Sequence, residues 1–125
     1  MQWLRSLTDA LRERTGPMNQ NDIMGFLGIC RKAGQLLCGH DVVKESVVSS
    51  KAQLVFLSSD ASERLEREMR HACTYGGKSI TVLRTPYTME EFGFSLGKKS
   101  AVFSVTDTGF ANKLLQKFGE ELHDN

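Results

Sequence analysis

Short apolar runs alternate along this chain with longer segments whose apolar residues recur at helical spacing. Four such runs predict strands, at Leu36–Cys38, Leu54–Leu57, Ser79–Leu83 and Ala101–Val105. The last three are apolar at neighbouring positions rather than at every second one. That pattern is typical of strands that are covered on both faces of a sheet.

Five helical segments accompany these strands, and most carry capping signals. Their expected N-caps or first residues are Asp22, His40, Asp60, Thr88, and either Asp107 or Thr108. Glu63 and Glu91 lie three residues after Asp60 and Thr88, which is the spacing of a capping box. Gly34 is expected to end the first helix in a left-handed conformation.

The second helix, His40–Ser50, is expected to point Val43, Val47 and Val48 into the core. With five helices alternating with four strands, the pattern predicts an α/β fold. We expect a three-layer α/β/α sandwich with a four-stranded mixed sheet.

Residues 1–17 form a separate unit in the sequence. Trp3, Leu4, Leu7 and Leu11 recur at helical spacing, which predicts an amphipathic leader helix before a domain spanning residues 18–125. Two interpretations stay open. The leader is either a native helix that packs on the domain or on a partner, or a segment added for expression ahead of a natural start at Met18.

Composition constrains function only loosely. A chain of 125 residues can bury the core of one domain without disulfides or a structural metal. The net charge of +1 means that any nucleic-acid surface must be a local patch. The odd set Cys30, Cys38 and Cys73 predicts reduced, mostly buried thiols in a cytoplasmic protein. Since no stretch approaches the roughly 18 apolar residues of a membrane span, none is expected.

Two Cys/His pairs, Cys38 with His40 and His71 with Cys73, contain possible zinc ligands. Residues two apart on a helix diverge by about 200°, and neither pair has the usual Cys-x-x-Cys spacing. We therefore expect no metal and no other cofactor. No nucleophile–base pair stands out either, so the sequence does not predict an enzyme.

Several motifs follow one another in a recognisable order. They are Phe26–Gly34 (FLGICRKAG), Gly39 before a helix, Lys51–Ser62 (KAQLVFLSSDAS), Leu96–Lys98 (LGK) and Val105–Ala111 (VTDTGFA). In this order the chain resembles the superfamily of kink-turn RNA-binding ribosomal proteins, of the L-seven-Ae and L-thirty-e type. It is most similar to the bacterial YlxQ-type branch.

The resemblance implies a small non-enzymatic protein that binds structured RNA, ribosomal or kink-turn-like. It further implies that the start of the helix after the first strand and the loop before the last strand hold the RNA. The residues expected to bind RNA are Gly39, His40, Asp41, Lys44, Lys98 and Lys99, with electrostatic support from Arg31 and Lys32. Arg31 and Lys32 are expected to join Lys98 and Lys99 in one basic rim at an end of the sheet.

The sequence departs from the archaeal-type kink-turn reader at the start of this helix. Such readers have an Asn-Glu pair where this chain has Asp41 and Val42, and a lysine where it has Glu45. An ionised Asp only accepts hydrogen bonds, whereas an Asn amide also donates them. An alternative function is therefore a protein-interaction module on the same fold that has lost kink-turn recognition. Ribosome or translation-factor association and a monomeric state are further expectations.

Overall fold

The computed structural model describes residues 19–123, in which five α-helices alternate with four strands. The helices are α1 (Asn19–Lys32), α2 (His40–Val48), α3 (Glu63–Thr74), α4 (Met89–Leu96) and α5 (Thr108–His123). The strands are β1 (Leu36–Cys38), β2 (Leu54–Leu57), β3 (Thr81–Arg84) and β4 (Val102–Val105). The leader expected at residues 1–17 lies outside the described residues.

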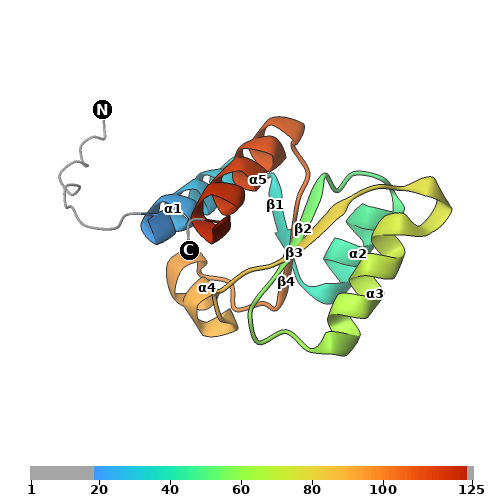
Figure 1. Ribbon diagram of the computed structural model, residues 1–125, viewed down its shortest axis with the longest axis horizontal. Coiled ribbons are helices and arrows are strands. Elements are labelled where there is room, and N and C mark those ends of the chain that lie inside the picture. Colours follow the sequence, from blue (N-terminus) through green and yellow to red (C-terminus); the bar gives the residue numbers. More distant parts are fainter. Residues whose placement is uncertain (1–18, 124–125) are drawn as a thin grey trace.

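The strands form one mixed sheet in the order β1-β4-β2-β3. Strands β2 and β3 run parallel, whereas β4 runs antiparallel to both β1 and β2. Helices α1, α4 and α5 cover one face and α2 and α3 cover the other (Figure 1). The three-layer sandwich and the mixed sheet expected from the sequence are therefore confirmed.

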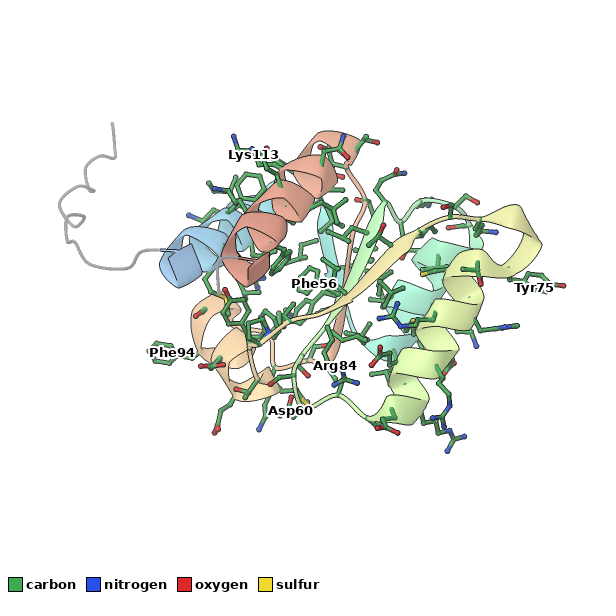
Figure 2. All side chains as sticks on the ribbon, in the orientation of Figure 1. Phe56, Asp60, Tyr75, Arg84, Phe94 and Lys113 are labelled. Carbon is green, nitrogen blue, oxygen red and sulfur yellow. The ribbon has the colours of Figure 1, made fainter. Side chains whose placement is uncertain are left out.

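Aromatic rings fill the core under α1, α4 and α5. The rings of Phe56 on β2 and Phe103 on β4 stack with their centroids 5.0 Å apart and an interplanar angle of 11°. Phe92 of α4 lies 4.7 Å from Phe103, and Phe118 of α5 also reaches Phe56. Figure 2 shows Phe56 at the centre of the molecule. These contacts hold two helices against the middle of the sheet.

The core under α2 and α3 is aliphatic. Val43 and Val47 of α2 pack with Met69 and Cys73 of α3 over the second face of the sheet. Val48 is 64% exposed, so its expected inward position is wrong. One residue after Val47 is a rotation of about 100° around the helix, which turns Val48 toward solvent.

The capping signals are confirmed at three helix ends. Thr88 and Glu91 form the expected capping box of α4. The Asp107 carboxylate accepts a hydrogen bond of 2.8 Å from the Phe110 amide, which identifies it as the cap of α5. Gly34 follows α1 with a φ of 75°, the left-handed conformation expected there.

Two expected N-caps are wrong. Helix α1 already begins at Asn19 and includes Asp22, since polar residues cost a helix only a few tenths of a kcal/mol each, roughly. Helix α3 is capped by Ser62, whose hydroxyl accepts from the Leu65 amide. The Asp60 carboxylate instead accepts from the Met89 amide, 3.1 Å away at the start of α4.

The Arg84 side chain organises the loop between β2 and α3. Its guanidinium donates to the carbonyl oxygens of Ser58, Ser59 and Ala61 at 2.8–3.3 Å. It also forms an ion pair with Glu66, at 2.6 Å between Nη2 and Oε1. Figure 2 shows Arg84 and Asp60 together at this end of the sheet. The loop is therefore held by one cation from the edge strand β3.

We expect Arg84→Ala to lower the free energy of unfolding by about 2 kcal/mol, because several charge-assisted hydrogen bonds are lost. Arg70→Ala is a matched control, since Arg70 pairs with the same Glu66 but is half-exposed and lies one turn away on α3. Its loss should cost only about 0.5 kcal/mol. Urea unfolding followed by circular dichroism measures both. Equal losses would contradict the role given to Arg84.

Candidate nucleic-acid interface

Strand β4 joins two segments that are far apart in the sequence. Cys38, the last residue of β1, lies opposite Phe103 of β4. The Gly39 amide then donates to the Val102 carbonyl oxygen at 3.1 Å and to the Ser100 hydroxyl at 3.2 Å. The start of α2 and the loop before β4 are thus hydrogen-bonded to each other. We call this surface the Gly39 edge; it comprises Gly39, His40, Asp41, Val42, Lys44 and residues 97–101.

The start of α2 leaves backbone amides available to a ligand. Gly39 has a φ of 100°, which disfavours any side chain, and the space where a Cβ would stand is open. Among the described residues no side chain caps this terminus. The amides of His40, Asp41 and Val42 belong to the first turn and have no acceptor within the helix. Such a terminus attracts anions.

Three of the expected site residues are held in one polar network. When its ring is protonated, His40 donates through Nδ1 to Asp41 and through Nε2 to Glu68 of α3, both at 2.8 Å. Lys44 Nζ donates to the same Glu68 carboxylate oxygen at 2.9 Å. Glu68 therefore holds two cationic side chains of α2 side by side.

The network changes the proton affinity of its members. Hydrogen bonds to Asp41 and then to Glu68 raise the pKa of His40 above 6.5. The Lys44 ammonium and the His40 ring lower the pKa of Glu68 below 4.5. Between these two pKa values His40 carries a positive charge and Glu68 a negative one. His40 therefore keeps its positive charge to a higher pH than a histidine without these partners.

The loop before β4 carries Lys98 and Lys99 directly ahead of Ser100, which accepts from the Gly39 amide. Gly97 ends α4 with a φ of 76°, and both lysines are exposed. Lys99 packs closely on α4: a Cβ on Gly93 would stand 3.2 Å from the Cβ of Lys99. A side chain at position 93 would therefore press on the loop.

Acidic groups limit the positive charge at this edge. The pKa of Asp60 is lowered, first by polar contact with the Ser58 hydroxyl, then by the Met89 amide and by the charge of Lys99. The Ser58 hydroxyl is buried, and within residues 19–123 it has no hydrogen-bond partner of good geometry. The Asp60 carboxylate thus offsets part of the positive charge of Lys99.

Arg31 and Lys32 lie at the opposite end of the sheet. They end α1 just before Gln35, whose carbonyl oxygen accepts from the Thr106 amide beyond the far end of β4. The expected single basic rim is therefore wrong, because β4 runs antiparallel to β1 and separates the two pairs of cations. A contribution of Arg31 and Lys32 to RNA binding stays a prediction.

Sequence reasoning missed Ser100 and Glu68. The Ser100 hydroxyl accepts from Gly39 and donates to the Val102 carbonyl oxygen at 2.9 Å, so it fixes the loop against α2. Glu68 holds His40 and Lys44. The contacts of Ser100 with Gly39 and of Glu68 with His40 and Lys44 join residues more than twenty positions apart, and the local sequence carries no signal for them.

The remaining polar chemistry is sparse. In residues 19–123 no three His, Cys, Asp or Glu side chains come close enough to hold a metal ion. Burial raises the pKa of both Cys30 and Cys73 to about 11, so these thiols stay protonated. None of the helices between residues 19 and 123 has the length and apolar content needed to span a membrane.

Comparison with known proteins identifies the family. No protein-family model matches the chain. The RNA-binding protein YlxQ of Bacillus subtilis is 34% identical over 95 residues, which cover 72% of this chain and 88% of that protein. The chain belongs to the YlxQ family. YlxQ of Enterococcus faecium is 28% identical over 95 residues, covering 76% of this chain and 89% of that protein. The resemblance to the YlxQ-type branch is thus confirmed.

Solved structures show the same fold as this YlxQ-family chain. A protein of unknown function from Bacillus halodurans superposes with a TM-score of 0.68 at 31% identity, covering 76% of this chain and 94% of the other. The 15.5 kDa RNA-binding protein of Giardia lamblia superposes with a TM-score of 0.61 at 16% identity, covering 87% of this chain and 92% of its own. At that identity the second comparison shows the fold alone.

We expect the His40 ring to titrate above pH 6.5, and Asp41→Asn and Glu68→Gln each to lower its pKa by removing a carboxylate acceptor. Glu45→Gln is the control, since it removes a carboxylate elsewhere on α2. Histidine ring signals in a two-dimensional NMR titration report the value.

The raised pKa also fixes the sign of the stability effect. The contribution of His40 is fully present below its unfolded-state pKa of 6.5 and is lost as pH rises through the folded-state value. A His40 pKa at or below 6.5, unchanged in both variants, would contradict the network.

Proposed function

We propose that this protein is a small, non-enzymatic, cytoplasmic RNA-binding protein that associates with structured RNA through the Gly39 edge. The observation that carries the proposal is the hydrogen-bonded junction between the uncapped start of α2 and the loop carrying Lys98 and Lys99. The junction places backbone amides and two lysines on one surface. Together they offer several contacts to the phosphates of a folded RNA strand.

The relatives support the same proposal. The two YlxQ proteins, each aligned with this chain over most of its own length, are named RNA-binding proteins. The Giardia protein, also named for RNA binding, has the same fold. Neither YlxQ protein is named as an enzyme, in line with a binding role for this chain.

We further propose that the RNA it binds carries a ribosomal or kink-turn-like motif. The Asp41 side chain is 98% exposed at the start of α2, where it can accept a hydrogen bond from a base amino group. Val42 is 49% exposed beside it and can pack on an unstacked base. Unstacked bases with accessible edges are the features that sequence-specific RNA recognition uses. A kink-turn displays such bases.

The exposed Val42 also favours the alternative, a protein-interaction module on the same fold. Pull-down from native lysate with and without ribonuclease separates the two functions. Ribonuclease-sensitive partners, such as ribosomal material, support RNA binding. Protein partners that persist after ribonuclease treatment support the interaction module.

We expect the double variant Lys98→Glu, Lys99→Glu to lower affinity for the RNA that crosslinks to the protein by about tenfold or more. Loss of two phosphate contacts should also reduce the magnitude of the slope of log K against log salt concentration by about 1.5. Filter binding across a salt series measures both quantities.

The charge-matched control is Arg31→Glu, Lys32→Glu. It makes the same change in net charge at the opposite end of the sheet, so a smaller loss is expected. Equal losses in the two double variants would show that net charge alone governs binding. An unchanged affinity and salt slope for the first variant would overturn the Gly39 edge as the RNA surface.

A further inference from the structure

An open groove runs between α2 and α3 on the outer side of the sandwich. Its volume is about 350 Å³, and it is lined by Lys44, Val48, His71, Ala72, Tyr75 and Lys78. Lys44 also belongs to the Gly39 edge. On α2, His40, Lys44 and Val48 are spaced four residues apart and so share one side of the helix. The groove therefore continues the Gly39 edge from Lys44 to Val48, about 6 Å along α2.

The groove exposes apolar surface that the fold does not use. Val48 is 64% exposed and Tyr75 is 69% exposed. Figure 2 shows Tyr75 projecting into solvent at the end of α3. Its ring lies next to that of His71, with the centroids 5.8 Å apart and an interplanar angle of 47°. Val48, Ala72 and the two rings thus form a surface that accepts a flat, apolar group.

The charges of the lining indicate which group fits. Lys44 and Lys78 are the two lysines that line the groove, and no carboxylate is among its lining residues. Glu68 forms an ion pair with Lys44 of the lining, and it is also paired with His40. A ligand of complementary chemistry has a flat apolar part and a negative charge next to it.

We infer that this groove binds an unpaired nucleotide of the RNA held at the Gly39 edge, with its base stacked on Tyr75 and its phosphate near Lys78. The inference rests on the proposed function. Aromatic side chains flanked by cations are the usual means of holding single-stranded RNA, and stacking tolerates any base. The groove then extends the bound RNA from the folded motif into its unpaired flank.

Affinity for single-stranded RNA tests the groove directly. The probe is fluorescein-labelled oligouridine, with binding to the full chain measured by fluorescence anisotropy at two salt concentrations. Tyr75→Ala should weaken binding by about fivefold or more, the loss typical of one stacked base. Lys78→Gln should weaken it less and reduce the salt slope by about 0.7, as for one phosphate contact on a single strand.

The matched control is Phe94→Ala, which removes another highly exposed aromatic ring, on α4 and outside the groove. It should bind oligouridine as the unmodified chain does. Thermal unfolding of each variant confirms that the fold is kept. The inference is overturned if the chain does not bind oligouridine, if Tyr75→Ala binds like the unmodified chain, or if Phe94→Ala loses as much affinity.

Photocrosslinking locates the contact. Native RNA labelled with 4-thiouridine is crosslinked to the protein, and the digest with trypsin is read by mass spectrometry. Cleavage after Arg70 and Lys78 gives the peptide 71–78, which contains both aromatic rings of the groove. A nucleotide adduct on this peptide supports the inference. An adduct-free peptide 71–78, or one crosslinked to another protein, overturns it.

The two proposals fail in different ways. If the Gly39 edge does not bind RNA, the Lys98→Glu, Lys99→Glu variant keeps its affinity for structured RNA. If only the groove is wrong, that variant loses affinity for structured RNA while Tyr75→Ala keeps full affinity for oligouridine.

Discussion

The position of β4 between β1 and β2 determines where this protein can act. Because β4 runs antiparallel to both neighbours, its first residues meet the last residues of β1. The Gly39 amide and the Ser100 hydroxyl are joined at that point, across 61 positions of sequence. Stacking of Phe56 on Phe103 holds β2 against β4 in the core beneath. Without this central strand, the start of α2 and the loop with Lys98 and Lys99 would not share a surface.

The same end of the sheet balances positive and negative groups. Glu68 neutralises part of the charge of His40 and Lys44. The Asp60 carboxylate and the Lys99 ammonium attract each other, which helps to lower the pKa of Asp60. A nearly neutral chain can thus present a cationic surface whose side chains are held in place before a ligand arrives. Fixed side chains lose less conformational entropy on binding than mobile ones do. The carboxylates also restrain non-specific attraction to any polyanion.

Local patterns predicted most of the fold, but only part of the site. Apolar runs placed all four strands, and the capping box at Thr88 was found because its signals are three residues apart. Asp60 was assigned to the wrong helix, because the amide it bonds, that of Met89, lies 29 positions away. The expected basic rim of Arg31 and Lys32 with Lys98 and Lys99 is also wrong, because it depends on a pairing of strands far apart in the sequence. Nothing local in the sequence says that β4 enters between β1 and β2.

An NMR titration of the uniformly ¹⁵N-labelled chain shows directly whether RNA binds at the Gly39 edge. The titrant is the RNA that crosslinks to the protein, transcribed in vitro. We expect the largest changes in amide shifts at residues 40–42 and 97–101, which meet only in the folded protein. Changes concentrated around Arg31 and Lys32, with the amides of the Gly39 edge unmoved, would contradict this expectation.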